Sequence, residues 1–163
     1  LVKIYICDNE FYLQEKLYKR GLTNSALIEE LKTLNIGDDI IYADSAEPDR
    51  IEELRDAGFT VLEADKAVNK GIDHVQSCHL HILDDSENLK KEIQSYQWQQ
   101  DRNGNRLDKP VKTFDHLMDG VRYGIYTHSK GFEFVVIGAD GVTSESANAQ
   151  LLQEMYMIEH YLR

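Results

Sequence analysis

Three side chains have the types and spacing expected of a metal-dependent hydrolytic site. Asp44 follows the apolar run 40–43, so its carboxylate is predicted to lie at a strand tip, where open α/β sheets bind ligands. His116 and Asp119 are three residues apart in a helical pattern, which places an imidazole and a carboxylate on one face. This donor set suits Mg²⁺ or Mn²⁺, and the imidazole slightly favours Mn²⁺. Two such ions, about 3.5–4 Å apart, would activate water and stabilise the leaving oxygen of a phosphodiester.

The same residues also have an ordinary structural interpretation. Asp44 would cap the turn that follows its strand, and His116 and Asp119 would be solvated residues of a surface helix. On spacing alone this structural interpretation is favoured, so the metal site needs further support.

A basic segment precedes the helix predicted to carry His116. The whole chain has 18 Lys+Arg against 29 Asp+Glu, a net charge of −11, which argues against nonspecific electrostatic binding of nucleic acid. A local basic strip can nevertheless guide a phosphate backbone toward an acidic metal site. Residues 102–112 also contain an Asn-Gly signal, so we expect an exposed loop or β-turn. The basic residues of this segment are Arg102, Arg106, Lys109 and Lys112.

A second group of metal-ligand types lies between residues 74 and 81, and zinc is the metal it would suit. Its spacing does not match common zinc fingers, and residues 79–83 alternate like a half-buried strand. We therefore expect a strand, with a zinc site as the alternative. The four residues concerned are His74, Cys78, His79 and His81.

Two further pairs have side chains that suit contact with DNA. Lys66 and Lys70 would contact phosphates, although solvated loop lysines are the simpler interpretation. Tyr96 and Trp98 would stack on bases, whereas aromatic residues at this spacing are more often one buried and one exposed.

Strand and helix patterns alternate along the chain and must position these residues. Residues 1–17 predict an antiparallel hairpin that turns at 8–10, and Thr23 is expected to cap a helix. Residues 40–43 are continuously apolar, which is typical of a strand buried on both faces, and Pro48 begins the next helix.

The later elements continue this alternation. We expect strands over residues 60–62, 79–83 and 132–138, and helices over 70–78, 86–100 and from Leu151 onward. Another helix is predicted from residue 113, with a buried stripe of Phe114, Leu117, Met118, Val121 and Ile125. The order predicts an α/β fold with a mixed central sheet flanked by helices.

Length and composition limit the class of protein. The 163 residues suffice for one globular domain, and no stretch approaches the roughly 20 apolar residues of a membrane span. The first residues do not form a signal peptide, and two cysteines, Cys7 and Cys78, provide no disulfide framework. We expect a cytoplasmic protein that is not associated with a membrane.

A series of motifs resembles the nuclease domain of bacteriophage large terminase subunits. The motifs occur in order between about residue 1 and residue 126, beginning with Asp44-Ser45-Ala46-Glu47-Pro48 and residues 51–59. They continue with residues 66–72, residues 96–104 and the run from Phe114 to Tyr123. The resemblance implies an RNase H-like fold and a metal-dependent endonuclease that cuts concatemeric viral double-stranded DNA during packaging. It also implies the terminase small subunit and the portal protein as partners, in the cytoplasm of an infected bacterial host.

The resemblance assigns metal binding to Asp44, His116 and Asp119, and Asp115 stands where the family usually has Asn. The family's first catalytic Asp precedes the segment that matches the start of this chain. We therefore expect 1–163 to be one nuclease domain, a fragment without that first strand.

The upstream ATPase motor of the family is also expected to be absent, since the chain has no Walker A glycine loop. Asp140 follows an apolar strand pattern and is a substitute candidate for the first catalytic Asp, although a hairpin turn at Asp140 and Gly141 is the favoured interpretation. A different class of function therefore stays open, namely a catalytically incomplete DNA-binding or assembly module of the packaging motor.

Overall fold

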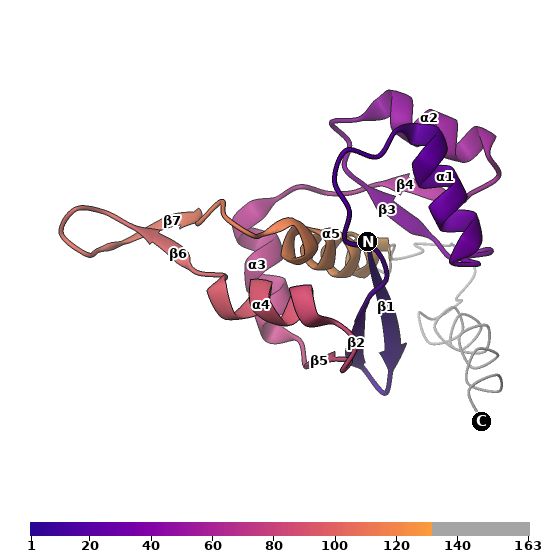
Figure 1. Ribbon diagram of the computed structural model, residues 1–163. Coiled ribbons are helices and arrows are strands. Elements are labelled where there is room, and N and C mark those ends of the chain that lie inside the picture. Colours follow the sequence, from indigo (N-terminus) through magenta and orange to yellow (C-terminus); the bar gives the residue numbers. More distant parts are fainter. Residues whose placement is uncertain (132–163) are drawn as a thin grey trace, which may run out of the picture. The chain divides into compact units, whose positions relative to one another are not determined.

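The structure, a computed structural model, describes residues 1–131, and residues 1–129 form one compact unit (Figure 1). The chain begins with an antiparallel hairpin of β1 (Val2–Cys7) and β2 (Glu10–Glu15). Asp8 and Asn9 form its turn with φ values of 49° and 66°, a left-handed conformation that short polar residues tolerate. The hairpin predicted from the sequence is therefore confirmed.

The described strands form three separate sheets. β2 also pairs in parallel with β5 (Leu80–Ile82), which gives a mixed three-stranded sheet in the order β1-β2-β5. β3 (Ile41–Ala43) and β4 (Val61–Glu63) form a parallel pair. β6 (Trp98–Gln100) and β7 (Arg106–Pro110) form an antiparallel hairpin that projects away from the helices in Figure 1.

Five helices are described within residues 1–131. Thr23 caps the first of them, because its hydroxyl accepts a hydrogen bond of 3.2 Å from the backbone N–H of Ala26. Pro48 occupies the first turn of the second helix, as expected. The helices are α1 (Asn24–Thr33), α2 (Pro48–Asp56), α3 (Val68–Ser77), α4 (Glu87–Ser95) and α5 (His116–Gly131).

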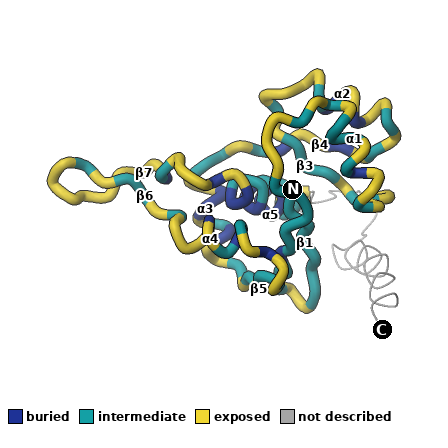
Figure 2. Tube along the Cα trace, viewed as in Figure 1, coloured by how far each residue is buried: buried dark blue, intermediate teal, exposed yellow. Residues whose placement is uncertain are grey.

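The hydrophobic core is centred on α5. Four of its side chains, together with Leu13 of β2, Val75 of α3 and Leu89 of α4, form one buried cluster. Figure 2 shows buried stretches of the chain, in dark blue, on α3, α4 and α5. The four α5 residues are Leu117, Met118, Val121 and Ile125, so most of the predicted stripe is confirmed. A second cluster lies around Leu31, Ile51, Leu54 and Val61, where α1 and α2 pack on the β3–β4 pair.

Three expectations about individual elements are wrong. Ile40 is 49% exposed and β3 is only half-buried, because β3 pairs with β4 alone among the described strands. The helix expected over 86–100 ends at Ser95, because the chain turns outward into the β6–β7 hairpin. Phe114 is 60% exposed with φ at +52°, so it precedes α5 and does not join the buried stripe.

Among residues 1–131, none of the helices combines the length and the apolar composition of a membrane span. The strand expected over 132–138, the helix expected from Leu151 and the candidate Asp140 lie outside the described residues.

Candidate metal and nucleic-acid site

The first turn of α5, which carries Asp119, is held by a buried carboxylate from another helix. Oε2 of Glu92 on α4 accepts hydrogen bonds from the backbone N–H groups of Leu117 at 2.7 Å and Met118 at 3.0 Å. Glu92 is only 1% exposed. Its negative charge therefore caps the positive end of the helix and fixes where α5 begins.

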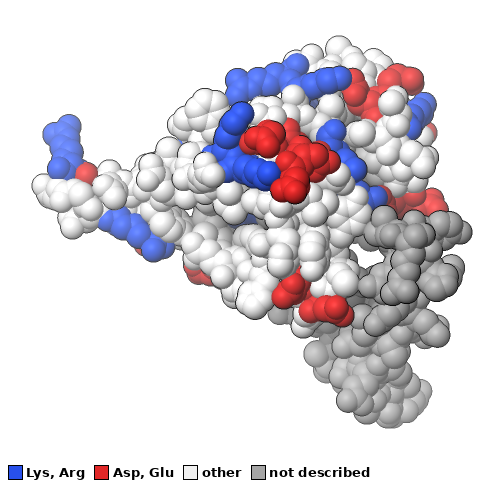
Figure 3. Space-filling model, turned by 60° about the horizontal axis from the view of Figure 1, so that its bottom comes forward, with Lys and Arg blue, Asp and Glu red and all other residues white. Residues whose placement is uncertain are grey.

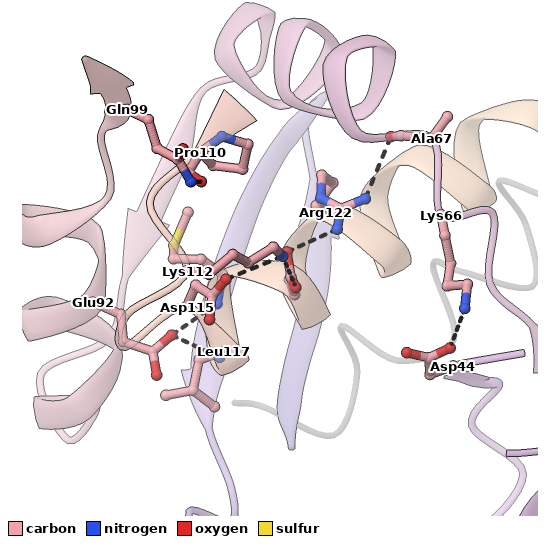
Figure 4. A network of polar contacts seen from close by, with 12 residues as sticks. Asp44, Lys66, Ala67, Glu92, Gln99, Pro110, Lys112, Asp115, Leu117 and Arg122 are labelled. Carbon is pink, nitrogen blue, oxygen red and sulfur yellow. Dashed lines mark hydrogen bonds and ion pairs between the residues drawn. The ribbon is translucent and has the colours of Figure 1, made fainter. Parts of the chain in front are cut away.

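Asp119 lies between two cations. Its Oδ1 accepts a hydrogen bond of 2.7 Å from Arg122, and its Oδ2 accepts one of 3.1 Å from Nζ of Lys112 (Figure 4). Lys112 Nζ is also 3.2 Å from Oδ2 of Asp115, the residue just before α5. Burial lowers the pKa of Lys112, but Asp119 and Asp115 outweigh that effect and hold it above its ordinary value.

Arg122 is itself held in a tight position against α3. It is 3% exposed and donates a hydrogen bond of 3.3 Å to the carbonyl oxygen of Ala67. Gly71 leaves room for it, since a Cβ there would lie 2.8 Å from the Arg122 Cγ. The close approach of α3 and α5 therefore orients the guanidinium toward Asp119.

Asp44 follows β3, as the sequence predicts, and is also paired with a cation. Its Oδ1 lies 2.9 Å from Nζ of Lys66 and accepts a hydrogen bond of 2.8 Å from the backbone N–H of Ala46 (Figure 4). Burial raises the pKa of Asp44, but Lys66 and the Ala46 N–H outweigh it, so the pKa lies below its ordinary value. The turn-capping role and the ion pair occur together at this residue.

Tyr123 on α5 interacts with both carboxylates. Burial raises the pKa of its hydroxyl, and the charges of Asp119 and Asp44 raise it further. Two hydrogen bonds keep β3 and the chain after β4 against α5: Tyr42 Oη to His128 Nδ1 at 3.0 Å, and the Asp65 N–H to Thr127 Oγ1 at 2.9 Å.

Carboxylate oxygens are ligands that a hard divalent cation prefers, and Asp115 and Asp119 both direct an oxygen at the ammonium group of Lys112. His116 is exposed at the first residue of α5. Within residues 1–131, however, no three His, Cys, Asp or Glu side chains are close enough together to hold a metal ion as they stand.

A basic groove borders this acidic group. It has a volume of about 540 Å³, and its lining from α3, β6, β7 and the loop after β7 holds three lysines, Lys70, Lys109 and Lys112, against one acid, Asp108. On the projecting hairpin the Arg106 guanidinium lies 4.2 Å from the ring centroid of Trp98, while Arg102 is exposed in the loop. Figure 3 shows Lys and Arg on this hairpin, and carboxylates bordered by Lys and Arg in the middle of the same face.

The alternative zinc group does not assemble among the described residues. His79 Nδ1 and His81 Nε2 lie 3.4 Å and 2.7 Å from the Glu10 carboxylate, whereas the Cys78 thiol donates to the His74 carbonyl. The strand interpretation is confirmed, because β5 covers residues 80–82.

Three contacts at the site were not predicted from the sequence: the Glu92 cap, the Arg122 pair with Asp119, and Lys112 between two carboxylates. Asp119 and Arg122 are three residues apart on a helix, and this spacing is a signal that would have identified their ion pair. No local pattern connects Glu92 to Leu117, which is 25 residues away.

Comparison with known proteins gives consistent matches. Residues 1–126 match the family described as Terminase RNAseH like domain. The PBSX phage terminase large subunit of Bacillus subtilis (strain 168) is 24% identical over 118 residues, which cover 70% of this chain and 27% of that protein. The chain thus spans about a quarter of the length of this curated relative.

Two solved structures share the fold. The nuclease domain of the g2p large terminase from bacteriophage SPP1, solved with bound Mn, matches with a TM-score of 0.65 and 18% identity, covering 80% of this chain and 77% of that one. Large terminase from a thermophilic bacteriophage matches with a TM-score of 0.63 and 23% identity, covering 77% of this chain and 36% of that one. The expected α/β, RNase H-like fold is confirmed.

Proposed function

The chain belongs to the terminase RNase H-like domain family, and from this premise we propose that it is a divalent-metal-dependent endonuclease that cuts concatemeric viral double-stranded DNA during genome packaging. The observation that carries the proposal is the family match over residues 1–126, which includes Asp44, His116 and Asp119. The g2p nuclease domain, a structural relative, was solved with bound Mn, which supports Mn²⁺ or Mg²⁺ as the metal here.

Asp44, His116 and Asp119 would hold the metal in this proposal. The bound ion, or a pair of ions, would supply an activated water and a positive charge beside the leaving oxygen. The protein's own part is to hold the carboxylates: Arg122 orients Asp119 at 2.7 Å, and the turn at Ala46 orients Asp44 at 2.8 Å.

The basic residues would hold the DNA backbone beside these acids. Lys70, Lys109 and Lys112 line the groove next to Asp119, and Lys66 pairs with Asp44 at 2.9 Å. The remaining predicted contacts, Arg102 and Arg106, extend this basic surface along the β6–β7 hairpin. Cations near the acids would bind phosphates, while the acidic remainder of the chain would repel DNA from other surfaces.

The wider setting is part of the same proposal. The family match supports a role within a packaging motor, with the terminase small subunit and the portal protein as partners, in the cytoplasm of the infected bacterial host. One nuclease domain over residues 1–163 would perform this role.

A second candidate is a catalytically incomplete DNA-binding or assembly module. The observation in its favour is that residues 1–131 bring no three metal-ligand side chains together. If a residue outside that range, such as Asp140, completed the site, this observation would no longer favour the incomplete module.

Plasmid cleavage distinguishes the two functions. Supercoiled DNA is incubated with the whole chain in Mn²⁺, in Mg²⁺ or in EDTA, and with the variants Asp44→Asn and Asp119→Asn. The endonuclease proposal expects nicked and linear DNA with metal only, and a loss of at least about 100-fold in both variants, since even indirect metal contacts cost 10- to 100-fold. Asp73→Asn, an exposed residue of α3, is the matched control. DNA binding without cleavage in either metal would instead favour the incomplete module.

A further inference from the structure

Phe114 exposes a large aromatic side chain on a strained piece of backbone. It is 60% exposed, more than any other large hydrophobic side chain among residues 1–131, and its φ is +52°. A left-handed φ is unfavourable for a bulky residue, because its Cβ crowds the carbonyl oxygen that follows. Neither the backbone conformation nor burial therefore explains a phenylalanine at this position. Residues held in such conformations cluster at functional sites.

The backbone on both sides of Phe114 is fixed by contacts of its neighbours. Before it, the Val111 N–H donates a hydrogen bond of 2.8 Å to the carbonyl oxygen of Gln97, next to β6. After it, the buried carboxylate of Glu92 accepts the first N–H groups of α5. The exposed ring is thus held in a defined place, so contact with a ligand would cost little ordering entropy.

The charges next to Phe114 indicate the kind of ligand that its ring would meet. Lys112, two residues before it, lines the basic groove between α3 and the β6–β7 hairpin together with Lys70 and Lys109. Among the described residues, Lys70 and Lys109 form no ion pair, so both ammonium groups are free to bind phosphates. An uncharged aromatic face beside such a groove suits a nucleobase, because every base presents a π-face.

We propose that Phe114 is a DNA-contact residue whose ring stacks on a base, while Lys70 and Lys109 hold phosphates of the same duplex. An apolar ring reaches the stacked bases of a duplex by wedging between neighbouring base pairs. The inference rests on the proposed function and adds an apolar contact to it. Phe114 lies two residues before His116 and five before Asp119, so the base that it holds would fix the DNA backbone close to the proposed metal ligands.

Fluorescence anisotropy of a labelled duplex in EDTA measures DNA affinity without cleavage. Phe114→Asn should weaken binding at least about fivefold at every salt concentration, because the ring carries no charge and its loss leaves the salt slope unchanged. Phe114→Tyr keeps an aromatic face and should bind within about twofold of the wild type. Lys109→Gln should instead reduce the log–log salt slope by about one unit. The matched control is Ile40→Asn, which removes an exposed apolar side chain before β3 and should bind like the wild type.

Thermal denaturation separates a contact with DNA from a role in folding. Asn tolerates a left-handed φ better than Phe, so Phe114→Asn should raise the melting temperature while it lowers DNA affinity. Ile40→Asn, where no left-handed φ is relieved, should not raise it. A phenylalanine that stabilises the fold by packing would give the opposite pair of results, a lower melting temperature with unchanged affinity.

A second readout uses the unmodified chain. A duplex that carries 5-iodouracil at its thymine positions is irradiated in complex with the protein, and mass spectrometry identifies the crosslinked residue. A base stacked on the ring should crosslink to Phe114. The other aromatic side chains of the hairpin and α5, Trp98 and Tyr123, provide the comparison.

The outcomes separate this inference from the proposed function. Wild-type affinity in Phe114→Asn, an equal loss in Ile40→Asn, a lower melting temperature in Phe114→Asn, or crosslinks that avoid residue 114 would each overturn the inference. If cleavage still requires metal, Asp44 and Asp119 in that case, the proposed function stands without it. A wild-type chain that neither binds nor cleaves DNA would overturn both.

Discussion

At the scale of single residues, Glu92 has the largest structural effect on the site. Its buried Oε2 accepts both N–H groups at the start of α5, and nothing else in the described chain serves these donors. We expect Glu92→Ala to lower the free energy of unfolding by about 3 kcal/mol, since hydrogen bonds to a charge are worth more than neutral ones. Glu92→Gln, which keeps an acceptor oxygen, should lose less.

Urea denaturation measures both variants of Glu92. Glu52→Ala, an exposed position of α2, is the control and should change stability by less than about 0.5 kcal/mol. A Glu92→Ala variant as stable as this control would show that α5 begins correctly without the cap.

Two helical glycines have opposite surroundings, which gives a second residue-scale prediction. A Cβ at Gly71 would lie 2.8 Å from Arg122 Cγ and 3.1 Å from its Cδ, whereas a Cβ at Gly120 meets nothing within 4 Å. Gly71→Ala should therefore destabilise the protein by about 1–2 kcal/mol, because the buried Arg122 cannot move aside. Gly120→Ala should stabilise it by about 0.5–1 kcal/mol. Thermal denaturation checks both, and equal shifts would contradict the packing argument.

At the scale of elements, the contact between β3 and α5 sets where Asp44 lies relative to Asp119. It includes the 3.0 Å hydrogen bond between Tyr42 and His128. Burial lowers the pKa of His128 below its ordinary value. The imidazole of His128 therefore binds a proton more readily in the unfolded chain than in the folded chain. The contribution of the neutral imidazole to the free energy of unfolding is fully present above about pH 6.5 and is lost as the pH drops below that value.

The variant His128→Gln removes this titration. We expect the melting temperature of the wild type to fall more steeply than that of His128→Gln between pH 7.5 and pH 5.5. Tyr42→Phe should cost about 1 kcal/mol at pH 7.5, through loss of the hydrogen bond. Parallel pH profiles for the wild type and His128→Gln would show that this histidine is not the linked group.

The β6–β7 hairpin is the second element with a prediction of its own. It projects from the helices, and Arg102 and Arg106 lie on it. If they contact phosphates, each replacement by Ala should reduce the log–log salt dependence of DNA binding by about one unit. Fluorescence anisotropy over a range of salt concentrations measures this slope, with Lys32→Ala on α1 as the control. An unaltered slope in both arginine variants would place the DNA elsewhere.

At the scale of the whole molecule, metal binding should stabilise the fold. A ligand that binds only the folded state, and is present at a concentration about 100 times its dissociation constant, adds about 2.7 kcal/mol to the free energy of unfolding. For a chain of this size that corresponds to a rise in melting temperature of roughly 5–10 °C. Differential scanning calorimetry in Mn²⁺ and in EDTA checks the rise, which Asp119→Asn should abolish. An equal melting temperature in both solutions would exclude a site formed only on folding.

The variant Asp140→Asn tests whether Asp140 completes the proposed site. If it is a ligand, Asp140→Asn should abolish plasmid cleavage as fully as Asp119→Asn, because either change removes charge that the metals need. If it is a turn residue, Asp140→Asn should be nearly neutral and the cleavage of this chain weak. Full activity together with a neutral Asp140→Asn would require a ligand that has not been named.

The sequence alone determined the local features of this protein. The polar turn at Asp8 and Asn9, the Thr23 cap and most of the apolar stripe of α5 depend on residues within one or two turns of one another. Such patterns are legible because backbone conformation and helical periodicity are local properties. The order of the short motifs sufficed in the same way to identify the family, which the match over residues 1–126 confirms.

Tertiary structure alone decided which partners these elements meet. The exposure of Phe114, the half-buried β3 and the end of α4 at Ser95 depend on where neighbouring elements stop and which strands pair. The Glu92 cap and the space that Gly71 leaves for Arg122 join segments 25 and 51 residues apart. No local pattern encodes such contacts, because they form only when packing brings distant helices together. The charges around Asp119 are therefore a product of packing as much as of its motif.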